Sequence, residues 1–129
     1  MTLPAGTPTI RVTAMPGDSN PYGDIFGGWL MGQMDLAAGS VASRRSGGRA
    51  VTIAADAMKF HMPVVVGDEV SVYAELIAVG RTSMTIEVEA WRRARHSNDS
   101  CKVTQARFIF VAVGDDRKPR PVPPSETGV

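Results

Sequence analysis

Phe26-Gly-Gly-Trp-Leu-Met-Gly-Gln-Met-Asp-Leu-Ala-Ala-Gly-Ser-Val-Ala-Ser-Arg-Arg45 is the stretch that decides the fold. Its two terminal arginines are followed closely by two glycines, and cations in a last turn before glycine are signals that end a helix. Between Trp29 and Ser43 the only ionisable residue is Asp35, and apolar or small residues occupy nearly every face. A helix that is apolar all round is a buried one, so residues 26–45 predict a helix enclosed by a sheet.

Alternation of apolar and polar residues predicts strands on both sides of this helix. Residues 9–15 alternate weakly and indicate one short strand before it. Four longer strands are predicted after the helix, at residues 51–58, 70–76, 84–91 and 103–113. Short turn-forming segments separate these four strands, and such connections predict antiparallel neighbours.

This order of elements predicts an α+β class, in which one antiparallel sheet wraps a long buried helix. The length of 129 residues suits a single domain, residues 1–129, with one core. Residues 1–8 are predicted to be a flexible arm and residues 114–129 a Pro-rich tail. One sheet over one helix leaves strand edges exposed. Pairing of two chains edge to edge would cover them, and we therefore expect an oligomer.

The composition argues against several classes of function. Fourteen Lys and Arg stand against thirteen Asp and Glu, and a net charge of +1 gives no general attraction to nucleic acid or to a membrane. Cys101 is the only cysteine, which excludes a disulfide within the chain and a cysteine-based zinc site. No secretory signal or membrane-spanning run is recognisable, so a cytoplasmic location is expected.

The chemistry is predicted at Gly23-Asp-Ile-Phe-Gly-Gly28, which places a carboxylate directly before the start of the helix. The first N–H groups of a helix lack partners within it, and together with the helix dipole they favour negative charge. Such a charge develops on the oxygen of a thioester carbonyl when water or a carboxylate attacks it. Gly28 and Trp29 are therefore the candidate N–H donors. Asp24 is the candidate general base or nucleophile, and Asn20 is placed to orient the water or the carbonyl.

Both carboxylates of this region have a structural interpretation as well. Asp24 also fits an N-terminal helix acid or cap, with the glycines serving the turn. Asp35 lies about 16 Å further along a continuous helix, so we do not expect one chain to use both carboxylates in one site. A second chain would be needed to bring Asp35 near a site. A buried acid that is hydrogen-bonded to a strand or to a partner is the alternative for Asp35.

The remaining polar residues give weaker signals. His61 and His96 lie at predicted strand ends without a matched Ser, Cys or Asp, so structural or surface roles are expected and no histidine metal site is predicted. Cys101 is expected to pack rather than react. Two segments offer groups that hold phosphates or amides: the turn Arg81-Thr82-Ser83 and the basic run Arg92, Arg93 and Arg95. A solvated surface is the alternative for each segment.

Asn20-Pro-Tyr-Gly-Asp-Ile-Phe-Gly-Gly-Trp29, continuing to Asp35, closely resembles the signature of the YciA-type acyl-CoA thioester hydrolases of the hotdog-fold superfamily. The likeness extends over about residues 10–123, with further matches in Phe60-His-Met-Pro-Val-Val-Val-Gly-Asp68, Gly80-Arg-Thr-Ser83 and Lys118-Pro-Arg-Pro-Val122. The resemblance implies a hotdog fold that pairs as a dimer with a continuous sheet, often further assembled as a hexamer, a trimer of dimers. It also implies hydrolysis of acyl-CoA to free acid and CoA without a metal or organic cofactor.

The resemblance also implies roles for individual residues. The family's catalytic aspartate falls on Asp24, and its oxyanion donors fall on N–H groups near Gly28 and Trp29, at the interface of two chains. The segments that contact CoA fall on two parts of the chain, represented by Met58, Phe60, Met62, Pro63, Val66, Arg81, Thr82 and Ser83. Met62 stands where the family usually has an arginine. Either Arg81 or the basic run Arg92 to Arg95 supplies the missing cation, or CoA is held less tightly.

Two other functions are compatible with such a fold. A hotdog module that binds acyl-CoA as a sensor or regulator, without turnover, would not need a carboxylate at Asp24, and the chain shows no added DNA-binding segment. A hotdog dehydratase would use a histidine in the site, whereas both histidines lie outside the segment 23–28. Hydrolysis of acyl-CoA is therefore the function that the sequence predicts.

Overall fold

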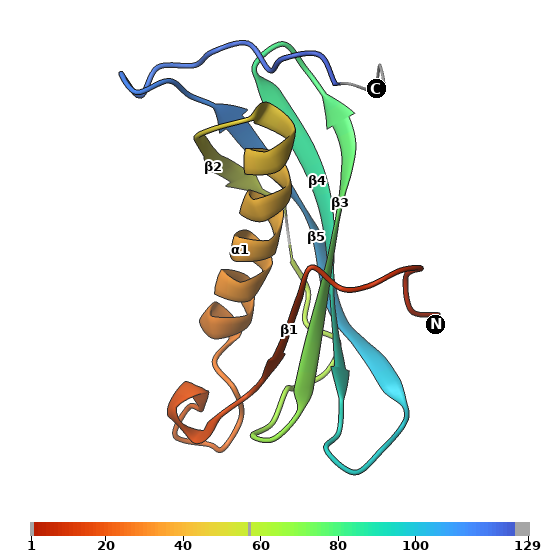
Figure 1. Cartoon of the computed structure of the whole chain (residues 1–129). Coiled ribbons are helices and arrows are strands. Elements are labelled where there is room, and N and C mark those ends of the chain that lie inside the picture. The colour runs from red at the N-terminus through yellow and green to blue at the C-terminus, as the bar shows by residue number, and fades with distance from the viewer. Residues whose placement is uncertain (1, 57, 126–129) are drawn as a thin grey trace.

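The computed structural model describes residues 2–56 and 58–125, and in these it places one long helix against one five-stranded antiparallel sheet (Figure 1). The elements are β1 (Ile10–Thr13), the short 3-10 helix η1 (Pro16–Asp18), α1 (Gly27–Ser46), β2 (Ala50–Ala55), β3 (Glu69–Val79), β4 (Ser83–Arg93) and β5 (Ser100–Ala112). The predicted hotdog fold is confirmed. Met1, Ala57 of the predicted strand 51–58, and residues 126–129 of the predicted tail lie outside the described residues.

The helix α1 begins and ends within one residue of the prediction. Its C-terminus closes as the glycines indicate, because Gly47 adopts a φ of 70° and donates its N–H to the carbonyl of Ser43. A side chain rarely adopts this left-handed backbone, and glycine adopts it without steric cost. Arg44 and Arg45 lie in the last turn, where cations offset the negative end of the helix dipole.

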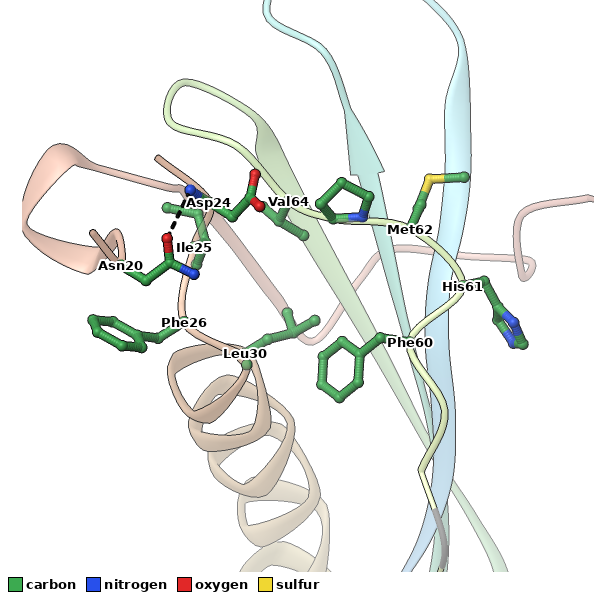
Figure 2. A pocket seen from close by; sticks show the side chains of 11 residues that line it. Asn20, Asp24, Ile25, Phe26, Leu30, Phe60, His61, Met62 and Val64 are labelled. Carbon is green, nitrogen blue, oxygen red and sulfur yellow. Dashed lines mark hydrogen bonds between the residues drawn. The ribbon is translucent and has the colours of Figure 1, made fainter. Parts of the chain in front are cut away.

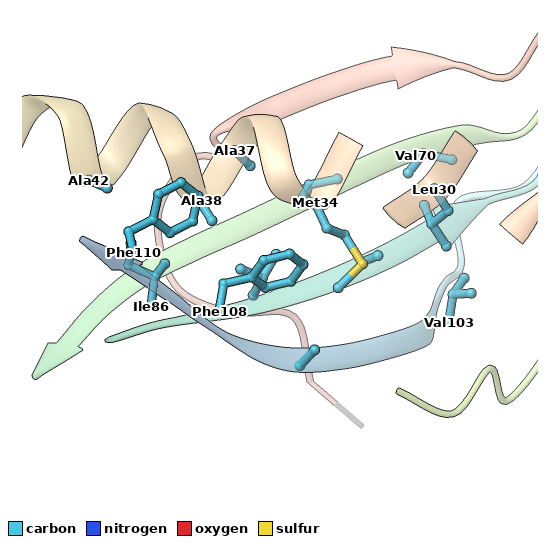
Figure 3. Close-up of a cluster of buried hydrophobic side chains, with 14 of the residues drawn as sticks. Leu30, Met34, Ala37, Ala38, Ala42, Val70, Ile86, Val103, Phe108 and Phe110 are labelled. Carbon is cyan, nitrogen blue, oxygen red and sulfur yellow. The ribbon is translucent and has the colours of Figure 1, made fainter. Parts of the chain in front are cut away.

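Burial of the helix is one-sided, so the prediction of burial all round is wrong for the single chain. The side toward the sheet is fully covered and carries Leu30, Met34, Ala37, Ala38 and Ala42 (Figure 3). Met31 and Leu36 on other faces are 44% and 63% exposed. The reason is geometric, since one curled sheet covers one side of a cylinder. The prediction that small residues allow close approach holds at Gly39, where a Cβ would lie 3.5 Å from the ring of Phe110.

The strand order is β1-β3-β4-β5-β2, with every pairing antiparallel. The prediction that consecutive strands are neighbours is correct for β3–β4 and β4–β5, which short turns connect. It is wrong for β2, which pairs with β5 at one edge and is separated from β3 by two strands. The segment between β2 and β3 is long enough to cross the sheet, and this segment forms part of the site described below.

The two ends of the sheet bring different segments together (Figure 1). The N-terminus of α1, the loop before it and the segment 63–68 meet at one end. The β3–β4 turn, the C-terminus of α1 and residues 113–125 meet at the other end. Among the described residues, no helix has the length and apolar character needed to cross a bilayer.

Candidate active site

A pocket of about 470 Å³ lies beside the N-terminus of α1 (Figure 2). Residues of the segment 20–30 form one wall, and residues 60–64 form the other. Asn20 and Asp24, two of the residues predicted to be catalytic, both line it. The two polar groups share this pocket with apolar side chains, including Phe26 and Leu30 of the helix start. The pocket therefore combines a carboxylate with apolar walls, as binding sites for small molecules commonly do.

Backbone hydrogen bonds hold the two walls together. The N–H of Ile25 donates to the carbonyl of Val64 at 2.8 Å, and Asp24 forms an antiparallel bridge with Val65. The N–H of Phe26 donates to the carbonyl of Asp18 at 3.0 Å. The loop that carries Asp24 is thus fixed to the segment 60–66 on one side and to η1 on the other, and the position of the carboxylate is set by the backbone.

Asn20 closes the loop that presents Asp24. Its Oδ1 accepts hydrogen bonds from the N–H groups of Tyr22, at 2.9 Å, and Asp24, at 3.1 Å. Its own N–H donates to the carbonyl of Asp24 at 2.6 Å, and Gly23 completes the turn with a φ of 89°. Since Oδ1 is occupied, the Nδ2 amino group is the end of the side chain that remains to donate. Figure 2 shows this nitrogen on the side of the pocket.

The start of α1 has no side-chain cap. The N-cap residue is Phe26, with extended backbone at φ −56° and ψ 133°, no side chain caps it, and the first turn contains no acid. The interpretation of Asp24 as a helix cap is therefore wrong. Because a helix leaves its first N–H groups without internal partners, this end keeps donors for a ligand.

The N–H groups of Gly28 and Trp29, the two predicted oxyanion donors, differ in their hydrogen bonding. The N–H of Trp29 donates to the carbonyl of Phe26 at 3.1 Å, so it is already occupied within this chain. Its role as an oxyanion donor stays a prediction. The N–H groups of Gly27 and Gly28 have no acceptor among the described residues. A Cβ added at Gly28 would meet nothing within 4 Å, and Gly27 itself lines the pocket. Gly27 was not among the predicted donors, although its place before Gly28 in the first turn gives the same signal.

Known proteins share this arrangement over nearly the whole chain. The model of the thioesterase superfamily matches residues 22–97. An acyl-CoA thioester hydrolase of Zymomonas mobilis is 58% identical over 121 residues, covering 94% of this chain and 81% of the relative. The acyl-CoA thioester hydrolase YciA of Salmonella typhimurium is 46% identical over 123 residues, covering 93% and 92%. The chain belongs to the YciA family of acyl-CoA thioester hydrolases.

Solved structures of similar proteins agree with this family. A thioesterase of Yersinia pestis, described as hexameric, matches with a TM-score of 0.90 and 45% identity, covering 95% of this chain and all of that chain. A thioesterase of Campylobacter jejuni, described as hexameric and hotdog-fold, matches with a TM-score of 0.85 and 39% identity, covering 92% and 91%. The fold and the enzyme class of this YciA-family chain are thus the predicted ones.

The residues predicted to contact CoA fall into two groups. Phe60, Met62 and Pro63 line the pocket, whereas Met58 packs against the core and Val66 lies exposed outside the pocket. The segment Arg81 to Ser83 lies at the other end of the sheet (Figure 1). There its backbone carbonyls accept hydrogen bonds from Ala112 and Val122. One YciA-family chain by itself does not bring these two groups together.

Asp35 forms a hydrogen bond with a strand. Its Oδ1 accepts a hydrogen bond from the hydroxyl of Thr52, in β2, at 2.6 Å. This is the structural arrangement foreseen as the alternative for Asp35. The carboxylate is partly exposed and lies beside the edge strand β2, far along the helix from the pocket at its N-terminus.

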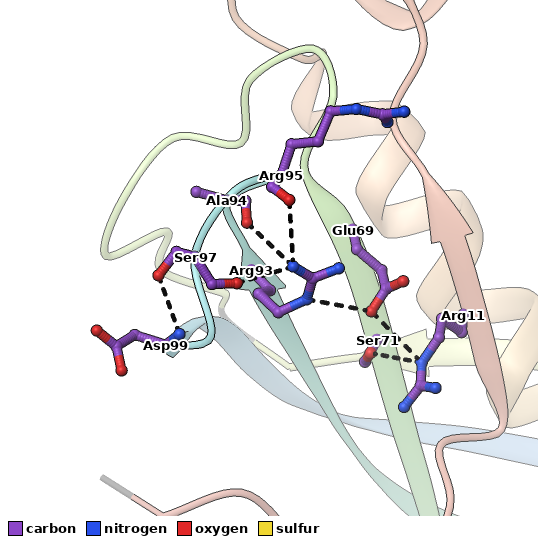
Figure 4. A network of polar contacts seen from close by, with 8 residues as sticks. All are labelled: Arg11, Glu69, Ser71, Arg93, Ala94, Arg95, Ser97 and Asp99. Carbon is purple, nitrogen blue, oxygen red and sulfur yellow. Dashed lines mark hydrogen bonds and ion pairs between the residues drawn. The ribbon is translucent and has the colours of Figure 1, made fainter.

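The basic run at the end of β4 divides into separate roles. Figure 4 shows that Arg93 stabilises the following turn, because its Nη1 donates to three carbonyls, the shortest at 2.8 Å to Ser97. Its Nε lies 3.5 Å from Glu69, which also pairs with Arg11. Arg92 instead points toward the segment 62–68, and Arg95 lies on the exposed turn.

The two histidines lie in different places, and three apolar residues form further walls of the pocket. His61 borders the pocket, but its ring points away from Asp24 in Figure 2. His96 lies elsewhere, on the exposed turn after β4. The walls formed by Phe26, Leu30 and Val64 were not predicted. The signal for Phe26 and Leu30 is their place close to Asp24 in the segment 20–30.

Proposed function

We propose that this chain hydrolyses acyl-CoA to the free acid and CoA, with Asp24 as general base or nucleophile. The single observation that carries the proposal is the shared pocket of Asp24 and the uncapped helix N-terminus. A sensor that only binds acyl-CoA would need neither a carboxylate nor unpaired N–H donors at one point. Membership of a family of thioester hydrolases supports the same choice.

The proposed reaction uses Asp24, Asn20 and Gly27, which line the pocket, and the adjacent Gly28. Asp24 either accepts a proton from water while the water oxygen bonds to the carbonyl carbon, or attacks that carbon itself and is released by water in a second step. The N–H of Gly28, assisted by that of Gly27, stabilises the negative charge on the carbonyl oxygen. The Nδ2 of Asn20 orients the carbonyl or the water. The C–S bond then breaks, and the CoA thiolate leaves and takes up a proton.

The proposed assembly follows from two surfaces that are exposed in the single chain, the edge strand β2 and part of the helix α1. Strand β2 is an edge of the sheet, and five of its six residues are exposed, including Ile53 at 59%. Met31 and Leu36 lie exposed on the helix. We infer that two chains pair through β2 to form a continuous sheet, and that three such dimers form the hexamer described for solved relatives.

The proposed CoA site then spans two chains. Phe60, Met62 and Pro63 contact the pantetheine arm beside Asp24 of one chain. The turn Arg81 to Ser83 of another chain provides its guanidinium, hydroxyls and N–H groups for the phosphates. Within one chain the two groups lie at opposite ends of the sheet (Figure 1), which supports this division.

Release of free thiol from a series of acyl-CoA substrates tests the activity directly. We expect turnover by the wild-type chain. Asp24→Asn should lower kcat by about 10²- to 10⁴-fold, the contribution typical of a positioned acid or base, while CoA binding persists. A wild-type chain that binds acyl-CoA without releasing thiol would instead favour the sensor.

The matched variant Asp35→Asn decides between the two carboxylates. One solved relative, 40% identical to this chain, is described as the Asp-to-Ala mutant of a broad-specificity acyl-coenzyme A thioesterase. An aspartate is therefore the kind of residue to test, and residues 20–35 contain Asp24 and Asp35. We expect Asp35→Asn to keep most activity because an amide oxygen still accepts from Thr52. Loss of turnover in Asp35→Asn with retention in Asp24→Asn would overturn the proposed role of Asp24.

Light scattering of Ile53→Lys tests the assembly. A lysine at the centre of β2 should oppose pairing of two such edges, so we expect a smaller species with little activity. Gln105→Lys on β5 is the control, because it adds the same charge at an exposed position away from that edge. Full activity in a species shown to be monomeric would contradict a site built from two chains.

A further inference from the structure

The segment 62–68 that forms a wall of the pocket is held at both ends by one side chain from the sheet. Nε of Arg92 lies 3.2 Å from the sulfur of Met62, at the start of the segment. Nη1 of the same guanidinium lies 3.5 Å from Oδ2 of Asp68, at its end. Arg92 belongs to β4, near the middle of the sheet. The segment is therefore fixed to the most extensively paired part of the fold.

Asp68 is the point at which this segment is most tightly bound. It is 2% exposed, and a buried carboxylate is costly unless it is paired and hydrogen-bonded. Its Oδ2 accepts from the N–H of Val65 at 3.0 Å, and its own N–H donates to the carbonyl of Val65 at 3.1 Å. Its carbonyl accepts from Ala14 at 2.9 Å. Arg92 supplies the cation for this carboxylate.

The middle of the same segment holds the loop of Asp24. Val65 pairs with Asp24, and the carbonyl of Val64 accepts from Ile25 at 2.8 Å. A chain of direct contacts thus runs from Arg92 through Asp68 and Val65 to Asp24. Arg92 itself is outside the lining of the pocket, so it acts on the carboxylate through the backbone.

We propose that Arg92 is a positioning residue for the hydrolysis, which holds the segment 62–68 and thereby sets Asp24 relative to the N–H groups of Gly27 and Gly28. The inference rests on the proposed function of Asp24. An arginine suits the task because its planar guanidinium reaches two partners at once, whereas the ammonium of lysine is a single point of charge. A misplacement of a catalytic group by about 1 Å lowers a rate by about 10²-fold.

Kinetics of Arg92→Met and Arg92→Lys, with Arg93→Met as matched control, test this role. Arg93 is adjacent on β4 and also makes an ion pair, but it contacts Glu69 and the turn after β4 rather than Met62 or Asp68. We expect kcat to fall by about 10- to 100-fold in Arg92→Met while KM changes little. Arg92→Lys should recover part of the loss, because it keeps a cation beside Asp68. Arg93→Met should keep kcat.

Hydrogen exchange of the Ile25 N–H gives a readout that does not depend on activity. Loss of Arg92 should speed exchange of this N–H, which bonds to Val64, while exchange in the β4–β5 pairing stays slow. Unchanged kcat in Arg92→Met, equal loss in Arg93→Met, or unchanged exchange at Ile25 would each overturn the inference. Failure of the proposed function itself would appear differently, as full activity in Asp24→Asn.

Discussion

The two ends of α1 are built in opposite ways. At the C-terminus, Gly47 and Gly48 both donate their N–H groups to the carbonyl of Ser43. The guanidinium of Arg120 donates to the carbonyl of Ser46 at 2.9 Å and to that of Val113 at 2.9 Å. At the N-terminus, no side chain caps the helix, and the N–H groups of the two glycines have no acceptor among the described residues.

The difference means that the C-terminus of α1 contributes to the stability of the fold, whereas its N-terminus is available for the reaction. The last carbonyl groups of a helix have no hydrogen-bond partners within it. At the C-terminus of α1, other parts of the chain donate to these carbonyls. The N-terminus keeps its N–H donors near Asp24, where the negative charge that develops on a thioester oxygen would accept hydrogen bonds from them. The same helix is thus fixed at one end and available to a ligand at the other.

After Asp24 itself, the largest loss of activity that would sharpen this contrast is expected at Asn20. In Asn20→Ala, the N–H groups of Tyr22 and Asp24 lose their common acceptor and the pocket loses the Nδ2 donor. We expect kcat for thiol release to fall about 10²-fold because Asp24 loses its fixed position. Ser19→Ala in the same loop is the control, since the Ser19 hydroxyl donates to the carbonyl of Pro16, which lies outside the pocket. Equal activity in Asn20→Ala and wild type would remove Asn20 from the site.

At the opposite end, Arg120→Met is expected to lower stability and leave catalysis intact. The variant removes charged hydrogen bonds to the last turn of α1 and to Val113, and the free energy of unfolding should fall by about 2 kcal/mol. Denaturant unfolding measures this loss. Arg117→Met in the same segment, whose side chain makes no comparable bond among the described residues, should change it by less than about 0.5 kcal/mol. A fall in kcat with unchanged stability would contradict the division between the two ends.

The smallest expected effect is a change in stability at the glycines found at each end of α1. Gly47→Ala places a Cβ on a left-handed backbone in open space, so it should cost about 1 kcal/mol from backbone strain alone. Gly28→Ala should cost no stability, since its φ lies outside that region and a Cβ meets nothing. Thermal unfolding of the two variants in parallel checks the contrast. Equal losses would show that Gly28 also serves the helix itself.

Local patterns in the sequence were enough for the elements and for the centre of the site. The bounds of α1 followed from Phe26, the two arginines and the glycines, because helix signals act between near neighbours. Alternation located the strands, and the position of Asp24 before the helix located the pocket. Strand β2 was misplaced because an edge strand chooses its partner through contacts distant in sequence.

The details of the site depend on contacts that no local pattern encodes. Donation from Trp29 to Phe26 depends on how the first turn closes. The contacts of Arg92 with Met62, 30 positions away, and with Asp68 join residues that are distant in sequence, across a strand order that local patterns do not specify. The sequence showed a basic run and a missing cation at Met62, but only the folded chain places one arginine of that run beside it.

The most direct test measures kcat and the unfolding midpoint of Asp24→Asn and Arg120→Met side by side. The contrast between the helix ends predicts that Asp24→Asn loses nearly all thiol release and keeps the wild-type midpoint. It predicts that Arg120→Met keeps wild-type kcat and unfolds at lower denaturant concentration. Near-wild-type kcat in a folded Asp24→Asn variant would contradict the central claim that the open end of α1, with its carboxylate, is where the thioester is cleaved.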